Sequence, residues 1–435
     1  MIQSNSDSEK RDTVSSSVTL SPSKQHDPFN SSTEQSTHLT VPLVPDTTTS
    51  HLPTPQNHVS IPFPTLVFPC TLSLEAEIDH YIQHHDFFVT KADFDRFELI
   101  RMTLSAIIKE CLPNALDVEL FGSARSTIIL PHSDVDFFVK LDDSPANQLE
   151  MLKIAKDALK SNPLFSVVSA NCGKRVTLIK GTTTVGVPLQ IDPDSTPSDH
   201  EISFDLVFGH QLGAFNGDLI STYCECDERV RPFLLLVKYF AKVYKINDAN
   251  KAKLSSYGWN ILCLCYLQLV SPPIIPNLQS ETYIAASDPS LVVNKTFEDG
   301  YVHFSCDCGP WTSRQSGLLP NPSDIEQQSS PRPLNTQSIG SLFVGLMDFV
   351  KNHFSPAVSL SLSHGTLLST DSVKHLLKPV SKLPPFIILD PFEFLRNVAA
   401  SVKSPGTLTE ACGAVLKEMG KKEPSFERIL SPKKS

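Results

Sequence analysis

The sequence predicts an α+β protein in which a mixed β-sheet is followed by a mostly helical part, behind a disordered N-terminal tail. Short apolar segments with period-two alternation, the pattern of strands, lie between residues 116 and 208. After Phe208 the apolar spacing becomes helical, as in the segment FLLLVKYFAK that starts at Phe233. With 435 residues, 40% of them hydrophobic, the chain is long enough for two folded domains.

The expected elements follow in order along the chain. Residues 1–70 are the expected tail, because Ser, Thr and Pro make up close to half of them and aromatic residues are few. Helical spacing begins at 72 and recurs over 94–108, and a further helix is expected over 151–159. Strands are expected over 116–121, 135–139, 165–168, 175–179, 187–191 and 201–208.

The segment from Glu119 to Lys140, ELFGSARSTIILPHSDVDFFVK, carries the main chemical signal. Asp134 and Asp136 are two residues apart at an expected strand, so both carboxylates project from one face. Two such carboxylates repel each other unless a cation lies between them, and hard oxygen ligands suit Mg²⁺. Gly122 and Ser123 precede them in a turn where the backbone and a hydroxyl could contact phosphate.

A third acid, Asp205, is the only central acid in the alternating segment from Glu201 to Phe208. On a strand beside Asp134 and Asp136 it would complete a three-acid site.

The spacing of Phe-Gly-Ser and Asp-x-Asp resembles the signature of the polymerase-beta-like nucleotidyltransferase superfamily. The later order RVRP, VK, K and LSSYGW (229–259), and ILDPFEFLRNV (388–398), resemble the non-canonical poly(A) polymerases and terminal uridylyltransferases. The resemblance covers roughly residues 72–398. It implies a catalytic palm over 90–208, a helical central (PAP-associated) domain over 72–89 and 209–398 with a surface insertion loop over 280–337, and a C-terminal helix and basic tail over 399–435.

The resemblance also implies the chemistry. A 3′ hydroxyl attacks the α-phosphate of an NTP, with two Mg²⁺ or Mn²⁺ ions stabilising the attacking and leaving oxygens. Asp134 and Asp136 would ligate both ions, and Asp205 would hold the catalytic one and help to take the hydroxyl proton. The implied nucleotide contacts are Gly122, Ser123, Lys238, Lys242 and Ser256 for the phosphates, Tyr257 for stacking on the base, Asn216 for the ribose 2′-OH, and Asp390, Glu393 and Arg396 in the nucleotide-recognition motif.

The choice of base depends on Arg396, which stands where many uridylyltransferases of the family have histidine. A guanidinium only donates hydrogen bonds, so it matches uracil O4 better than the adenine amino group and favours UTP. ATP stays open, because adenine also offers ring-nitrogen acceptors. Two other positions depart from the family: Gly217 replaces a usual Thr or Ser, and Gln190 replaces a common Lys.

The predicted function is therefore template-independent addition of UMP or AMP to RNA 3′ ends. One alternative is a poly(A) polymerase that uses ATP strictly. Another is the same palm with a small molecule or a second nucleotide as acceptor. The third is a catalytically silent scaffold that binds RNA or a protein partner.

The net charge and the composition of the chain limit the kinds of partner that we expect. The formal charge of −10 argues against a broad nucleic-acid-coating surface, so we expect local RNA contacts, an RNA-targeting protein partner and a monomer. No signal-peptide pattern is seen, and the most apolar run, 261–270, is too short for a membrane span, so we expect a cytoplasmic protein, with the nucleus as the alternative. The ten cysteines include Cys-x-Cys pairs but no Cys-x2-Cys, which favours buried thiols over zinc.

Overall fold

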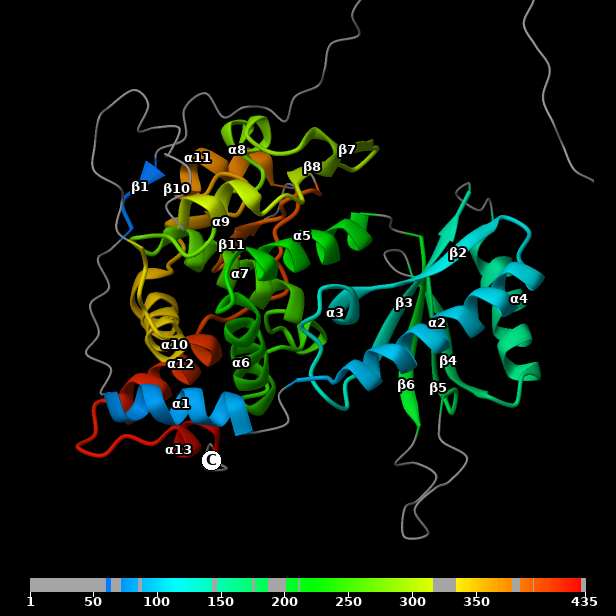
Figure 1. Ribbon diagram of the computed structural model, residues 1–435, viewed down its shortest axis with the longest axis horizontal. Coiled ribbons are helices and arrows are strands. Elements are labelled where there is room, and N and C mark those ends of the chain that lie inside the picture. The colour runs from blue at the N-terminus through cyan, green and yellow to red at the C-terminus, as the bar shows by residue number, and fades with distance from the viewer. Residues whose placement is uncertain are drawn as a thin grey trace, which may run out of the picture. The chain divides into compact units, whose positions relative to one another are not determined.

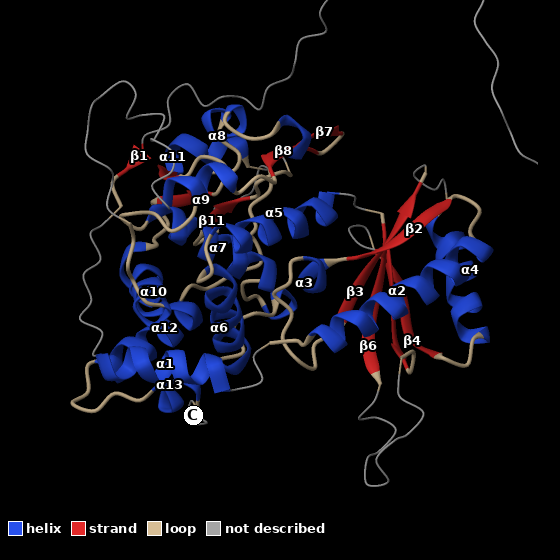
Figure 2. Ribbon diagram, viewed as in Figure 1, coloured by secondary structure: helices blue, strands red, loops and turns tan. Residues whose placement is uncertain are grey.

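The computed structural model describes residues 60–63, 72–84, 88–142, 147–173, 177–186, 201–209, 212–315, 334–377, 384–393 and 395–431. Most of the tail expected over 1–70, the strand expected over 187–191 with Gln190, and the last four residues lie outside the described residues. Figures 1 and 2 show the elements described below. None of the helices in these ranges combines the length and hydropathy that crossing a membrane requires.

A five-stranded mixed sheet forms the first part of the fold, as the alternation predicts. Its strands are β2 (Ala115–Leu120), β3 (Val135–Leu141), β4 (Phe165–Cys172), β5 (Thr177–Thr183) and β6 (Ile202–Phe208), in the spatial order β2-β3-β6-β5-β4. β3 and β6 run parallel, and the other neighbours are antiparallel. This parallel pair places side by side residues that are 69 positions apart in the sequence, such as Asp136 and Asp205.

Two helices cover this sheet, α2 (Lys91–Cys111) and α4 (Gln148–Ser161), packing against β2 and β4 (Figure 1). α2 buries Ile100, Leu104 and Ile108 at helical spacing. Its first turn is held by a capping box in which the Thr90 and Asp93 side chains accept from each other's backbone N–H groups. We call residues 91–208 the sheet region, which has its own hydrophobic core.

The helical region, α1 together with residues 212–430, has a second, larger core around Trp259, Phe240 and Tyr266. Its long helices are α1 (Leu72–His84), α5 (Leu212–Cys226), α6 (Val230–Val243), α7 (Ser256–Leu269), α10 (Ile339–Asp348) and α12 (Gly406–Met419). Its shorter turns are α11 (Thr370–Val373), α13 (Phe426–Leu430), the 3-10 turns Ala249–Lys251, Pro289–Leu291 and Lys374–Leu376, and the π-helical turn Phe349–His353. α6 is buried over most of its circumference, as its apolar sequence predicts.

A second sheet in the helical region has the order β1-β10-β9-β11. Its strands are β1 (Ser60–Ile61), β9 (Val358–Ser361), β10 (Thr366–Ser369) and β11 (Ile387–Leu389). The expectation of disorder up to residue 70 is wrong for residues 60 and 61, because β1 pairs with β10. β11 ends directly before Asp390 and so fixes the start of the predicted recognition motif.

The expectation of a surface loop over 280–337 is wrong for residues 281–315. This interval contains α8 (Glu281–Ala285), the hairpin β7 (Val292–Phe297) and β8 (Gly300–Ser305), and α9 (Gly309–Gln315) (Figure 2). Alternating apolar residues explain the hairpin, since Val302 and Phe304 are fully buried in the helical core. The Tyr301 N–H donates to the Phe392 carbonyl, so the hairpin also supports the recognition motif.

One contact between distant helices carries a stability prediction. The Glu77 carboxylate of α1 accepts hydrogen bonds from the Phe426 N–H at 2.9 Å and from the Ser425 hydroxyl at 3.1 Å, and so caps α13. Replacing it by alanine is expected to lower the free energy of unfolding by about 1 kcal/mol, as loss of a charged N-cap typically does. Urea denaturation would measure this, with Glu110→Ala on the exposed face of α2 as a control within about 0.5 kcal/mol of wild type. Equal effects of the two substitutions would contradict the capping role.

Candidate active site

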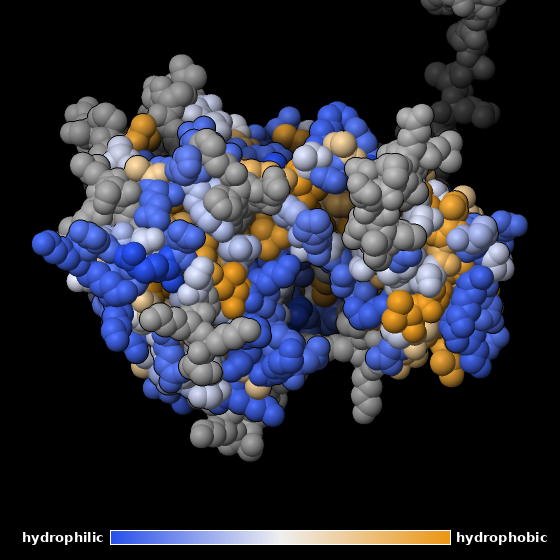
Figure 3. All heavy atoms as spheres, turned by 90° about the horizontal axis from the view of Figure 1, so that it is seen from below, coloured by the Kyte–Doolittle hydropathy of each residue, from blue (hydrophilic) through white to orange (hydrophobic). Residues whose placement is uncertain are grey.

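A pocket of about 450 Å³ lies between the sheet region and helices α5, α6 and α7. On the face drawn in Figure 3, hydrophilic side chains surround a hollow near the middle of the molecule. Ten of the thirteen predicted site residues line the pocket: Gly122, Ser123, Asp136, Asn216, Lys238, Ser256, Tyr257, Asp390, Glu393 and Arg396. The other three, Asp134, Asp205 and Lys242, are not among its lining residues.

The acids of the site come from the parallel strands β3 and β6. Asp136 and Asp205 are register partners, so their side chains leave the sheet side by side on one face. Asp134 lies one residue before β3 begins and is exposed to solvent. The structure therefore brings Asp136 and Asp205 together on neighbouring strands, with Asp134 just before the first residue of β3.

The electrostatics of the site centre on Asp136. Burial, together with the nearby charges of Asp205 and Asp134, raises the pKa of this carboxyl to about 7, while the Lys238 charge opposes the rise. Burial conversely lowers the pKa of Lys238 to about 8. A desolvated carboxylate beside two other acids is an environment that favours a bound cation.

Sequence reasoning missed Lys180 of β5. It is the register partner of Asp205, and its ammonium group is ion-paired with the Asp205 carboxylate. Within the described ranges, no three His, Cys, Asp or Glu side chains are grouped so that they could hold a metal ion as they stand. The oxygen donors of Asp134, Asp136 and Asp205 fit Mg²⁺ or Mn²⁺ by type, and Asp205 would join as a ligand once Lys180 releases it.

Gly122 permits the close approach of the Phe-Gly-Ser turn to Asp136. Its φ of +53° lies in the left-handed region, and a Cβ there would lie 2.4 Å from the Asp136 Oδ2 atom. Phe121 anchors the turn, because its N–H donates to the Asp136 carbonyl and its ring stacks on Phe138. Ser123 follows at the start of α3 (Gly122–Arg125) and lines the pocket.

Positive and hydroxyl groups occupy the opposite wall. The Lys238 ammonium group of α6 donates to the Ile128 carbonyl at 3.0 Å. Ser255 caps α7 by accepting from the Gly258 N–H, whereas Ser256 lines the pocket. The wall therefore offers one ammonium and one hydroxyl to a bound anion.

The recognition motif forms a connected polar cluster at the other end of the pocket. Tyr257 donates its hydroxyl to Asn216 Oδ1 at 2.9 Å and approaches Asp390 Oδ2 at 3.3 Å. Nη1 of Arg396 contacts Glu393 Oε2 at 2.7 Å and Asp390 Oδ2 at 3.2 Å. The guanidinium lies 5.6 Å from the centre of the Tyr257 ring, within cation–π range.

The Asp390 carboxylate is buried and is held by backbone hydrogen bonds. Its side chain is only 1% exposed, and its Oδ1 atom accepts from the Phe392 and Glu393 N–H groups at 2.9 Å. Burial raises its pKa, while the Arg396 charge lowers it. Burial also raises the pKa of Tyr257, so this hydroxyl stays protonated as a donor.

The lining residues that were not predicted as site residues include two with polar side chains, Ser126 and Asn260. Asn260 lies in the mostly apolar helix α7 and is 8% exposed. A buried amide on such a helix is a signal that could have identified it, because buried polar groups need partners.

Comparisons with known proteins find similar RNA nucleotidyltransferases. The family model described as "Poly(A) RNA polymerase, mitochondrial-like, central palm domain" matches residues 76–225. Terminal uridylyltransferase 7 of Homo sapiens is 27% identical over 321 residues, and terminal uridylyltransferase cid1 of Schizosaccharomyces pombe is 26% identical over 340 residues. The chain is thus similar to terminal uridylyltransferases and to poly(A) RNA polymerases.

Coverage differs between these relatives. The match spans 75% of this chain and 74% of cid1, but 73% of this chain and 19% of terminal uridylyltransferase 7. Caffeine-induced protein 16 of S. pombe is 32% identical over 218 residues, which are 48% of this chain and 16% of that protein. The chain therefore spans less than a fifth of the length of two of these relatives.

Solved structures of similar proteins share the fold. A solved structure described as "Structural Basis for the Activity of a Cytoplasmic RNA Terminal U-transferase" matches with a TM-score of 0.63 at 23% identity. The match covers 82% of this chain and 97% of that one. A Cid1 poly(U) polymerase structure described with Mg and 3′-dATP bound matches with a TM-score of 0.61 at 23% identity, over 82% and 98%. The predicted combination of a mixed sheet with a helical part is confirmed.

Proposed function

We propose that this protein is a template-independent RNA 3′-terminal nucleotidyltransferase that prefers UTP. The observation that carries the proposal is the juxtaposition of Asp136 and Asp205 on parallel strands at a pocket that also presents Lys238. The names of the relatives, which include uridylyltransferases and poly(A) polymerases, support the reaction class. The two hydrophobic cores support a catalytic palm over 90–208 and a helical central domain over 72–89 and 209–398.

The residues around the acids have the properties that the reaction requires. The 3′ hydroxyl of RNA attacks the α-phosphate, and pyrophosphate leaves in line. When bound, two divalent ions held by Asp134, Asp136 and Asp205 would stabilise charge on the attacking and leaving oxygens. Asp205 would help to accept the proton of the attacking hydroxyl.

The pocket walls bind and orient the triphosphate in this proposal. Lys238 supplies a positive charge from within a desolvated helix, and Lys242 lies one turn further along the same helix. The hydroxyls of Ser123 and Ser256 donate to phosphate oxygens from opposite walls. Gly122 lets the backbone approach the phosphates without a side chain in between.

Recognition of the ribose and base follows from the polar cluster. Because Tyr257 engages Asn216 Oδ1, the Asn216 Nδ2 amide is presented as a donor for the ribose 2′-OH. Arg396 uses Nη1 for both of its ion pairs, and within the described ranges its Nε and Nη2 make no hydrogen bond. These remaining donors match the carbonyl acceptors of uracil, which favours UTP over ATP.

Primer extension on a single-stranded RNA tests the proposal with each of the four NTPs and Mg²⁺. We expect extension with UTP to exceed that with ATP, and chelation by EDTA to stop both. Arg396→Ala is expected to reduce the UTP/ATP preference about tenfold, the value of one hydrogen bond to a charged group. Arg396→His, the residue of many relatives, should keep the preference for UTP.

The outcomes separate the alternatives. Wild-type protein that extends no RNA, and that matches Asp134→Ala in every assay, would end the proposal. Extension with ATP alone would indicate a poly(A) polymerase. NTP turnover without RNA products would favour a small-molecule or second-nucleotide acceptor, and RNA binding without turnover would favour a scaffold.

The proposal extends to the setting of the reaction. The acidic balance of the chain, with a net charge of −10, fits local RNA contacts assisted by an RNA-targeting protein partner. We propose a monomer in the cytoplasm, where the first structural neighbour is described as acting.

A further inference from the structure

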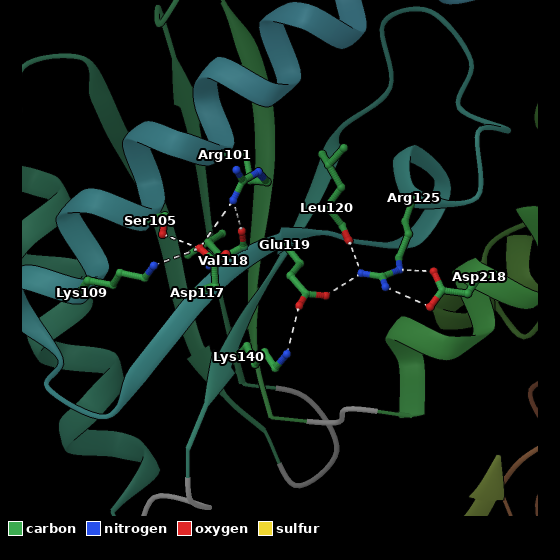
Figure 4. A network of polar contacts seen from close by, with 10 residues as sticks. All are labelled: Arg101, Ser105, Lys109, Asp117, Val118, Glu119, Leu120, Arg125, Lys140 and Asp218. Carbon is green, nitrogen blue, oxygen red and sulfur yellow. Dashed lines mark hydrogen bonds and ion pairs between the residues drawn. The ribbon is translucent and has the colours of Figure 1, made fainter. Parts of the chain in front are cut away.

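Arg125 connects the sheet region to the helical region. It is the last residue of α3, and its guanidinium reaches α5, where Nε and Nη2 contact Asp218 Oδ1 and Oδ2 at 2.6 and 2.9 Å. Nη1 contacts Glu119 Oε2 of β2 at 2.6 Å. Figure 4 shows the guanidinium lying between the two carboxylates. The arrangement is a bidentate ion pair across the two regions, steadied from the sheet side.

The ion pairs of Arg125 with Asp218 and Glu119 are partly buried. The side chains of Arg125, Asp218 and Glu119 are 24%, 31% and 29% exposed, in contrast to the Lys91–Asp95 pair, at 87% and 65%. Burial alone would lower the pKa of Arg125, but the Asp218 and Glu119 charges raise it overall. Exposed pairs contribute little, whereas a part-buried bidentate pair fixes its geometry.

The absence of a side chain at Gly217 makes room for the Arg125 side chain beside α5. A Cβ at Gly217 would lie 2.9 Å from Cδ and 3.0 Å from Cγ of Arg125. This is the position at which the sequence departs from the usual Thr or Ser. The missing side chain therefore leaves the space that the stem of Arg125 occupies.

The segments that Arg125 connects, α3 and α5, form two of the walls of the nucleotide pocket. Gly122 and Ser123 precede Arg125 on α3, and Asn216 precedes Asp218 on α5; all three of these flanking residues line the pocket. We propose that Arg125 is a positioning residue that holds α3 against α5, and so keeps the walls of the NTP pocket in their binding geometry before NTP arrives. This inference rests on the proposed function.

Loss of the clamp is expected to weaken NTP binding more than it slows the chemical step. Without the ion pair, the arrangement of α3 and α5 that binds NTP becomes one of several states of the free protein. The apparent affinity is then the intrinsic affinity multiplied by the fraction of molecules in that state. Once NTP is bound, its own contacts to both walls restore the geometry. We expect the Kd and KM for UTP to rise about tenfold in Arg125→Ala, with kcat changed less than about threefold.

The test compares full-length variants by three measurements: UTP binding by calorimetry, RNA extension kinetics, and hydrogen exchange of the nucleotide-free protein. Arg125→Ala should accelerate exchange in peptides covering 122–128 and 212–226, and Arg125→Lys should not restore UTP affinity, because an ammonium cannot make the bidentate pair. Gly217→Thr should resemble Arg125→Ala, and the double variant should be no worse than either one. Lys91→Ala, which breaks an exposed pair on α2, should match wild type.

Several results would overturn the clamp. These are unchanged exchange in both peptides, unchanged UTP affinity with faster exchange, a fall in kcat at constant KM, or additive effects of Gly217→Thr and Arg125→Ala. If wild-type protein binds UTP but extends no RNA, the proposed function fails. The Kd values of wild type and Arg125→Ala for UTP still test the positioning role of Arg125. If wild-type protein binds no UTP, both fail.

Discussion

Asp136→Asn is expected to lower the rate of RNA 3′-end extension at least about a thousandfold. The substitution keeps the size of the side chain and removes the charge that would hold divalent ions, an effect worth several kcal/mol, and each 1.36 kcal/mol is a factor of ten in rate. Asp136 is the most consequential acid, because it lines the pocket and lies beside Asp205 in register.

Single-turnover extension with saturating UTP and Mg²⁺ measures this effect separately from binding. Asp157→Asn is the matched control, since Asp157 is an exposed acid on α4 that lies outside the pocket. It should retain the wild-type rate. An Asp136→Asn protein that is folded by circular dichroism and extends RNA within tenfold of wild type would exclude the metal-binding role.

The parts of the fold that the sequence predicts are single strands and helices, because their apolar spacing depends only on residues close together in the chain. Alternation placed β3 and β6, and dense apolar spacing placed α6. The family motifs named ten residues that line one pocket: Gly122 and Ser123 begin α3, Ser256 begins α7 and Asp390 follows β11, whereas Lys238 lies within α6. The roles of those residues stay predictions until they are tested.

What the sequence alone does not reveal depends on pairing across long distances. The strand expected over 175–179 ended one residue before Lys180, and only the β5–β6 register shows that this lysine faces Asp205. The β7–β8 hairpin was missed because Pro, Ser and Gln dominate the later part of its interval, 316–337. The departure at Gly217 was visible, but its cause, the stem of Arg125, comes from a segment 92 residues earlier.

Gly122→Ala is expected to reduce kcat/KM for RNA extension about a hundredfold. The added methyl group would lie 2.4 Å from Asp136 Oδ2 and 3.0 Å from its Cγ, so either the carboxylate or the Phe-Gly-Ser turn must move. Displacement of a reacting group by about 1 Å commonly costs a factor of about 10². The collision involves a part-buried side chain whose backbone is fixed in a central strand, so the turn and the carboxylate cannot both keep their places.

Gly209→Ala separates this collision from backbone strain. Gly209 has a φ of +76°, comparable with +53° at Gly122, but a Cβ there meets nothing within 4 Å. Both alanine variants place an L side chain in the left-handed region, at a cost of about 1–2 kcal/mol, so both should lower the melting temperature. Only Gly122→Ala should lose extension activity. If the two variants lose activity equally, strain alone accounts for the loss, and the close approach of Gly122 to Asp136 has no part in catalysis.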